Sequence, residues 1–155
     1  MGISVESISI NPEVFWAKEH ATDNSFVVGD LIQFDPNGKV QLGVTTEWGV
    51  SHTAAGIARR PATGSENGDI EVEMIQFDRL YSVRIDSTTT HARALVGDWG
   101  NWVYTAGAGY LDLQTNTTWE MVVIALDGRD AEGTTSGRVL VRFRSSLLEF
   151  AVDRA

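Results

Sequence analysis

The chain has 155 residues, no cysteine, and 12 Lys and Arg against 21 Asp and Glu, which gives a net charge of −9. The lack of cysteine excludes disulfide bonds, thiolate metal sites and cysteine nucleophiles. The negative charge argues against nucleic acid as a partner, because phosphate binding needs clustered Lys and Arg. No apolar run approaches the ~20 residues of a membrane helix, and no secretory signal begins the chain. We therefore expect a soluble protein, made without export, that binds no membrane.

The first segment, residues 1–25, is expected to be an N-terminal arm. Val5 to Ile10 intersperses Val and Ile with Ser and Glu, which is typical of a short strand or an extended segment. Asn11-Pro12-Glu13 is a favourable helix start, with Asn as the N-cap and Pro at the first helical position. We predict one short helix from Pro12 to about His20.

The rest of the chain reads as a duplication. Val27-Val28-Gly29-Asp30 returns as Leu95-Val96-Gly97-Asp98 at an offset of 68, and Ile57-Ala58 returns as Ile124-Ala125 at an offset of 67. The third pair, at an offset of 69, is residues 68–74 and 137–143. Repeats of this kind report a supersecondary unit that is used twice. We assign residues 26–90 to a first β repeat and residues 91–155 to a second.

Each repeat has the pattern of short strands. Leu31 to Phe34 and Lys39 to Leu42 flank the turn sequence Asp35-Pro36-Asn37-Gly38, and this arrangement predicts a β-hairpin. The hairpin expected in the second repeat joins 102–105 to 110–113. Further strands are predicted at 54–59 and 121–126, which are apolar, and at 70–74 and 139–143, which alternate with period two. The predicted fold is mainly β, with β-tulip-like or small barrel units, an internal duplication and one short N-terminal helix.

A search for catalytic and metal-binding patterns favours structural roles. Ser51 and His52 are adjacent, which is poor triad geometry. Glu71 and Glu73 have a spacing that paired carboxylates can use, but we expect both on one exposed, solvated strand face. Asp127 belongs to a loop that resembles a cation loop only loosely. We therefore predict no enzyme, no cofactor and no metal.

The remaining sequence features concern the protein surface and self-assembly. The chain has five tryptophans, of which Trp16 lies in the predicted arm, where a partner-facing role and a core role are both open. Matched strands of the two repeats also differ in charge, so that neighbouring copies could pair an acidic strand with a basic one, whereas solvated faces that diverged after duplication are the alternative. The candidates for a subunit interface are Glu71, Glu73, Arg142 and Arg144.

One order of short runs resembles a known family. Residues 27–35 read Val-Val-Gly-Asp-Leu-Ile-Gln-Phe-Asp, residues 54–58 read Ala-Ala-Gly-Ile-Ala, and residues 68–74 read Gly-Asp-Ile-Glu-Val-Glu-Met, with an acidic Gly-rich loop before the last. This order is similar to the head-decoration, or capsid-cement, proteins of tailed bacteriophages. The similarity covers about residues 26–85 and, through the duplication, residues 95–150.

The resemblance implies a β-tulip-like or barrel body on the outer surface of the virion head, made in the host cytoplasm. It implies binding to the major capsid protein of the expanded shell, and self-association as a homotrimer. The simplest members carry the unit once and this chain carries it twice, so the oligomer number stays open. An extended N-terminal segment makes the shell contact in the family. The corresponding arm residues here are Ile3, Val5, Ile8, Ile10, Phe15 and Trp16.

Two other functions remain open from the sequence. A small-ligand or glycan-binding β module could use an aromatic stacking platform, for which the candidates are Trp48, Trp99, Trp102 and Trp119. Another virion part, such as a head-fibre or tail domain, would share the all-β composition.

Overall fold

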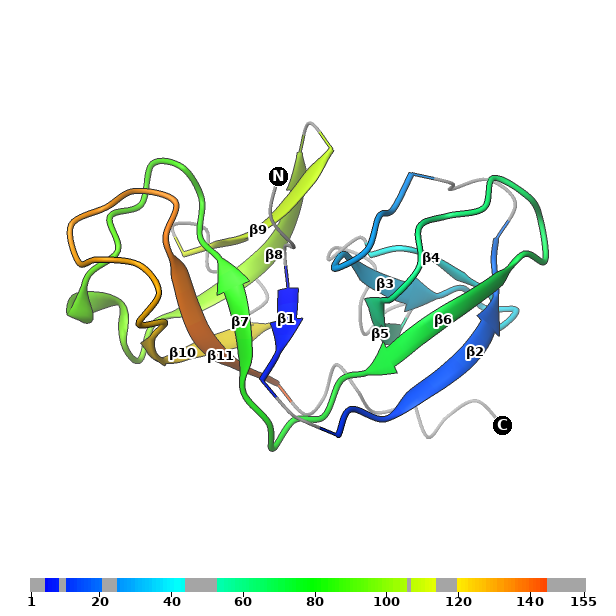
Figure 1. Ribbon diagram of the computed structural model, residues 1–155, viewed down its shortest axis with the longest axis horizontal. Coiled ribbons are helices and arrows are strands. Elements are labelled where there is room, and N and C mark those ends of the chain that lie inside the picture. The colour runs from blue at the N-terminus through cyan, green and yellow to red at the C-terminus, as the bar shows by residue number, and fades with distance from the viewer. Residues whose placement is uncertain are drawn as a thin grey trace.

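The computed structural model describes residues 5–8, 11–20, 25–43, 53–105, 107–113 and 120–144. Within these residues the regular structure consists of strands and one short 3-10 turn, Arg93–Leu95. The strands form two sheets that lie side by side along the long axis of the molecule (Figure 1). The mainly β class predicted from the sequence is confirmed, and no helix among the described residues is long and apolar enough to cross a membrane.

The first sheet has five strands in the order β2-β6-β5-β3-β4. Its neighbouring strands are all antiparallel. The strands are β2 (Val14–Lys18), β3 (Leu31–Phe34), β4 (Val40–Leu42), β5 (Thr53–Ala58) and β6 (Asp69–Met74).

The second sheet has six strands in the order β1-β7-β11-β10-β8-β9. It includes β1 from the start of the chain, which lies on the side of this sheet that faces the first sheet (Figure 1). The strands are β1 (Val5–Ser7), β7 (Tyr81–Arg84), β8 (Trp99–Thr105), β9 (Ala108–Asp112), β10 (Met121–Leu126) and β11 (Arg138–Phe143).

The two sheets repeat one topology, which confirms the internal duplication. The order β2-β6-β5-β3-β4 corresponds strand for strand to β7-β11-β10-β8-β9. Each unit is also curled by a parallel bridge between its first strand and its last strand, at Glu19–Val40 in the first and Ile85–Leu111 in the second. The sixth strand of the second sheet, β1, is therefore an addition that the first sheet lacks among the described residues.

Backbone hydrogen bonds fix the alignment of the two units. The N–H of Gly29 donates to the carbonyl of Ala58 at 2.8 Å, and the N–H of Gly97 donates to the carbonyl of Val123 at 2.8 Å. Ala58 is therefore equivalent to Val123, and the alignment of Ile57-Ala58 with Ile124-Ala125 is wrong by two residues. The chain from Gly97 to Val123 is three residues shorter than that from Gly29 to Ala58, and a β-bulge between Val123 and Ala125 turns Ile124 outward just after the equivalent position.

The predicted helix from Pro12 to His20 is wrong, because residues 14–18 form β2. Val14, Phe15 and Trp16 are β-branched or aromatic residues that suit a strand, and the exposure of β2 alternates with period two. Pairing with β6 supplies the backbone hydrogen bonds that the helix would have made internally. A favourable cap sequence is a weak signal, and tertiary pairing overrides it.

The strand arrangement also differs from the predicted boundaries at residues 26 and 91. β2, from the predicted arm, is a full member of the first sheet, and β7, from the predicted first repeat, belongs to the second sheet. The two hairpins are confirmed as β3–β4 and β8–β9, although the second has a tighter turn than predicted, since Thr105 pairs with Ala108.

The apolar core joins the two units. One cluster lies within the first sheet and includes Phe26, Ile32 and Val72. The larger cluster combines residues of the second sheet with Leu31 and Ile57 of the first. Burial of apolar surface is the main stabilising term in a fold of this kind, so the shared cluster holds the two sheets together.

Candidate functional site

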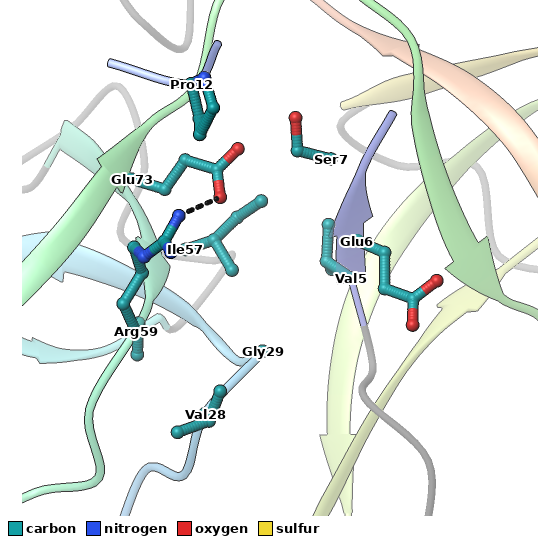
Figure 2. Close-up of a pocket in the computed structure, with 10 residues that line it drawn as sticks. Val5, Glu6, Ser7, Pro12, Val28, Gly29, Ile57, Arg59 and Glu73 are labelled. Atoms are coloured by element: carbon teal, nitrogen blue, oxygen red, sulfur yellow. Dashed lines mark ion pairs between the residues drawn. The ribbon is translucent and has the colours of Figure 1, made fainter. Parts of the chain in front are cut away.

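A cleft of about 330 Å³ separates β1 from the first sheet (Figure 2). It lies beside β1, which pairs with β7 in the second sheet and donates the N–H of Val5 to the carbonyl of Gly29, in the turn before β3, at 3.0 Å. Its walls are Val5, Glu6, Ser7, Pro12, Val28, Gly29, Ile57, Ala58, Arg59 and Glu73.

Charged side chains in and beside the cleft are already paired. Glu73 is only 7% exposed, and its Oε2 lies 3.5 Å from Nη1 of Arg59, the pair drawn in Figure 2. Glu71 is reached by Arg59 at 3.8 Å and by Arg60 at 3.7 Å. The expectation that both acids lie on an exposed, solvated face is therefore wrong for Glu73, because Glu73 lies in the wall of the cleft beside β1 and pairs with Arg59.

On its other side, β1 is held by a charged network. Oε2 of Glu6 lies 2.7 Å from Nη1 of Arg129, and Nη2 of Arg129 lies 2.6 Å from Oδ2 of Asp127. The hydroxyl of Ser82 on β7 donates to Asp127 at 2.5 Å. The hydrogen bonds from Arg129 hold the pKa of the Asp127 carboxyl well below its ordinary value. Asp127, the acid of the loose cation-loop motif, thus binds an arginine and a serine.

The predicted arm residues fall in different environments. Val5 is 1% exposed and packs in the protein's own core, so it does not present a free surface to a partner. Ile8 is 50% exposed just beyond β1. Phe15 is half-buried and packs on the first-sheet core, whereas Ile3 and Ile10 lie outside the described residues.

Trp16 is the most exposed tryptophan of the described residues, at 55%. The guanidinium carbon of Arg60 lies 4.7 Å from the centre of its ring, within the range of a cation–π contact. The sequence indicated Trp16 but not Arg60, because the two residues meet only when the loop after β5 folds over β2. By contrast Trp102 is buried and Trp99 half-buried, while Trp48 and Trp119 lie outside the described residues.

The predicted basic partner strand is β11. Arg142 and Arg144 are both exposed, and Arg142 occupies the position equivalent to Glu73 of β6. The difference in charge between matched positions is real in the fold, but Glu71 and Glu73 are paired within their own chain. Association of the two strands between copies stays a prediction.

The repeated Gly-Asp motifs form turns. The N–H of Asp30 donates to the carbonyl of Val27 at 3.1 Å, and the N–H of Asp98 donates to the carbonyl of Leu95 at 3.0 Å. Gly29 and Gly97 take positive φ values of 91° and 93°, which a glycine adopts without strain. The motif therefore turns the chain into β3 and β8.

The buried histidine is also structural. The ring nitrogens of His91 lie 3.2 Å from the carbonyl oxygen of Ala131 and 2.8 Å from that of Arg138, so the ring bridges the loop before β11. Ser51 and His52 lie outside the described residues. Among those the structure does describe, no group of three or more His, Asp or Glu side chains is placed to hold a metal ion.

The surface around β1 and β2 is thus the candidate functional site: a cleft with paired charges, an exposed tryptophan under an arginine, and the exposed Ile8. Its chemistry suits contact with another protein, because large aromatics and arginine are the commonest interface anchors. Comparison of the chain with models of protein families, with curated proteins and with solved structures gave no match.

Proposed function

We propose that the protein is a structural capsid-decoration protein of a tailed bacteriophage, which binds the outside of the expanded head and stabilises the junctions between capsomers. The observation that carries the proposal is the order of the runs that resemble this family. These runs lead into or form β3, β5 and β6, which are neighbouring strands of one sheet. The order is therefore that of a folded unit rather than of scattered common residues.

The body fits this role in physical terms. The two β units share one apolar cluster, so the chain forms a single body with two related halves. Its net charge of −9 keeps decorated particles apart in solution. The proposed partners are the major capsid protein and further copies of the chain, in a trimer in which Arg142 and Arg144 face the β6 side of a neighbour.

Counting the protein in purified virions tests the role. Quantitative mass spectrometry would compare its copy number with that of the major capsid protein. A copy number close to that of the capsid protein supports decoration of the whole shell. A handful of copies would move the protein to a vertex, tail or fibre, and complete absence from virions would refute a virion role.

A second experiment tests the arm. Removing residues 1–25 would delete β1 and β2 and so disturb both sheets, which makes truncation a poor probe. Ile8→Asp instead places a charge on the exposed end of the arm, and we expect it to reduce co-sedimentation with expanded heads that lack the protein. Val96→Asp is the matched control, because Val96 is 48% exposed in the second unit and Ile8 is 50% exposed. Equal binding by both variants would refute a role for Ile8.

A further inference from the structure

The outer edge of β2 is an open strand edge within the described part of the chain. The N–H of Met74 donates to the carbonyl of Glu13 at 2.8 Å, and the N–H of Glu19 donates to the carbonyl of Gly68 at 2.9 Å. Antiparallel pairing alternates, so odd-numbered residues of β2 bond to β6 and even-numbered residues turn their backbone groups outward. The backbone groups of Val14, Trp16 and Lys18 therefore face away from the sheet.

The second unit shows what such an edge receives. There β7, the equivalent of β2, pairs antiparallel with β1, and Glu6 lies opposite Ser82. Because Phe15 pairs with Val72 and Tyr81 with the equivalent Val141, Ser82 is the counterpart of Trp16. We call the position beside the outer edge of a unit's first strand, where a further strand can pair, its seat. The seat that β1 fills beside β7 thus corresponds, in the first unit, to the outer backbone edge of β2 at Trp16.

Burial shows the effect of leaving the seat open. Tyr81 and Val83, the inward-facing residues of β7, are fully buried, with β1 paired beside them. Their counterparts on β2, Phe15 and Ala17, pack against the core of their own sheet but remain only half-buried. The apolar side of β2 is consequently incomplete in a way that an added strand would correct, since such a strand would cover Ala17 as Val5 covers Val83.

In both units an arginine lies beside the seat. In the second unit Arg129, from the loop between β10 and β11, donates to the hydroxyl of Ser82 at 2.7 Å and pairs with Glu6 of the added strand. In the first unit Arg60, from the corresponding loop between β5 and β6, lies over Trp16. A carboxylate on a strand added to β2 would come to Arg60 as Glu6 comes to Arg129.

We infer that the edge of β2 is a binding site for an extended segment of a partner protein, which adds as an antiparallel strand with an acidic residue opposite Trp16 and an apolar residue opposite Ala17. The partner is a different protein, because each copy has two seats and one β1, and a β1 taken from a second copy would leave its own seat empty. Backbone pairing supplies the affinity, while the arginine and the apolar position select the sequence. This inference goes beyond capsid decoration and does not depend on it.

The test uses the full-length protein and a capped synthetic peptide with the sequence of residues 3–9, Ile-Ser-Val-Glu-Ser-Ile-Ser, which contains the strand that fills the equivalent seat. Binding would be followed by amide NMR shifts and by hydrogen exchange of the backbone amides. We expect saturable binding with a Kd of about 1 mM or tighter, and protection gained at the amides of Trp16 and Lys18. Failure to approach saturation by about 10 mM peptide would overturn the inference.

Two matched pairs make the result specific. N-methylation of the peptide at its glutamate removes the donor that would face Trp16 and is expected to abolish binding, whereas N-methylation at its valine blocks an outward donor and should not. Arg60→Ala should weaken binding about fivefold, and Arg93→Ala, which removes another exposed arginine that is paired with a glutamate, should leave it unchanged.

Two other outcomes would contradict the inference. Amide shift changes centred on Ser82, which already pairs with Glu6, with dependence on Arg129 would mean that the peptide exchanges with β1 instead of adding to β2. Protection at Trp16 in the free protein that is lost on dilution would mean that a second copy covers the edge. Virion counting is independent of all these readouts, so failure here and failure of the decoration role can be told apart.

Discussion

The two units share one strand order but anchor an equivalent loop with different side chains. This loop joins β5 to β6 in the first unit and β10 to β11 in the second. In the first, the buried carboxylate of Glu19 accepts hydrogen bonds from the backbone N–H groups of Thr63 and Gly64 and from the hydroxyl of Thr63. In the second, the equivalent residue is the apolar Ile85, and the His91 ring bridges the loop instead. Strand register is thus preserved between the copies, while the means of anchoring the loop has changed.

The units also differ at the edge of their first strand. β7 is covered by β1 and fully buries its inward side chains, whereas β2 is an edge strand among the described residues and its inward side chains are half-buried. The covered unit gains a charged network around Ser82 that holds the added strand. The comparison indicates that the same scaffold serves as a closed structural element in one copy and as a receptive one in the other.

The largest effect is expected from the first unit's loop anchor. Glu19→Ala leaves the donors of Thr63 and Gly64 without their acceptor, so the free energy of unfolding should fall by about 3 kcal/mol in urea titrations. Glu66→Ala is the control, because Glu66 is an exposed acid paired with Lys39. If both variants unfold alike, Glu19 does not anchor the loop.

Truncating Val5, the side chain that packs β1 into the core, should lower the free energy of unfolding by a somewhat smaller amount. Val5→Ala opens a small cavity in the shared core, and we expect a loss of about 2 kcal/mol in the same titration. Val27→Ala makes the same chemical change at a half-exposed site and should stay within about 0.5 kcal/mol. If Val5→Ala also lowered the free energy of unfolding by no more than about 0.5 kcal/mol, β1 would be only loosely attached to the second sheet.

The network around β1 should make stability depend on pH. The pKa of Asp127 is lowered in the folded protein from 3.8, so its carboxylate stabilises the fold above that pH, and the contribution is lost as pH falls through the folded pKa. Asp127→Asn should lower the free energy of unfolding by about 1–2 kcal/mol at pH 7. This difference should shrink below about pH 4, and a constant difference down to pH 2 would contradict the assignment.

The smallest effects on stability compare the two equivalent positions at the strand edge. Trp16→Ala removes a large but exposed side chain and should change the free energy of unfolding by no more than about 1 kcal/mol. Ser82→Ala removes only a hydroxyl, yet that hydroxyl bonds Asp127, Arg129 and Arg138, so a loss of about 1–2 kcal/mol is expected. A larger loss for Trp16→Ala would show that its ring supports the fold.

Much of the fold could be predicted from local patterns. The hairpin at Asp35-Pro36-Asn37-Gly38 follows from turn residues, and β11 follows from alternation of apolar and polar residues. β2 could not be predicted, because a favourable helix cap preceded a run whose partner, β6, lies more than fifty residues away. The alignment of Ile57 with Ile124 failed for a related reason, since a difference in length between the two units is invisible where the sequence stays apolar across it.

The candidate site was only partly accessible from the sequence. Trp16 was indicated by its type and its place outside the assumed repeat, but Arg60 and the open edge depend on pairing between distant segments. Val5 was expected at a surface because alternation identifies a strand without saying which sheet receives it. The arrangement of charges around Glu73 was likewise hidden, because the cleft beside β1 and the pairing with Arg59 arise only in the folded chain.

The sequence by itself determined the β class, the duplication and most strand positions, because turn residues and period-two patterns act over a few neighbouring residues. Only the tertiary structure decided that β1 pairs with the second unit, while β2 stays an edge strand of the first in the part of the chain that the structure describes. The physical reason is that strand pairing joins backbone groups that every residue carries, so local sequence does not encode which edge a strand will choose. That choice rests on the burial of Val5 and on the network of Glu6, Arg129 and Asp127, which exist only in the folded chain.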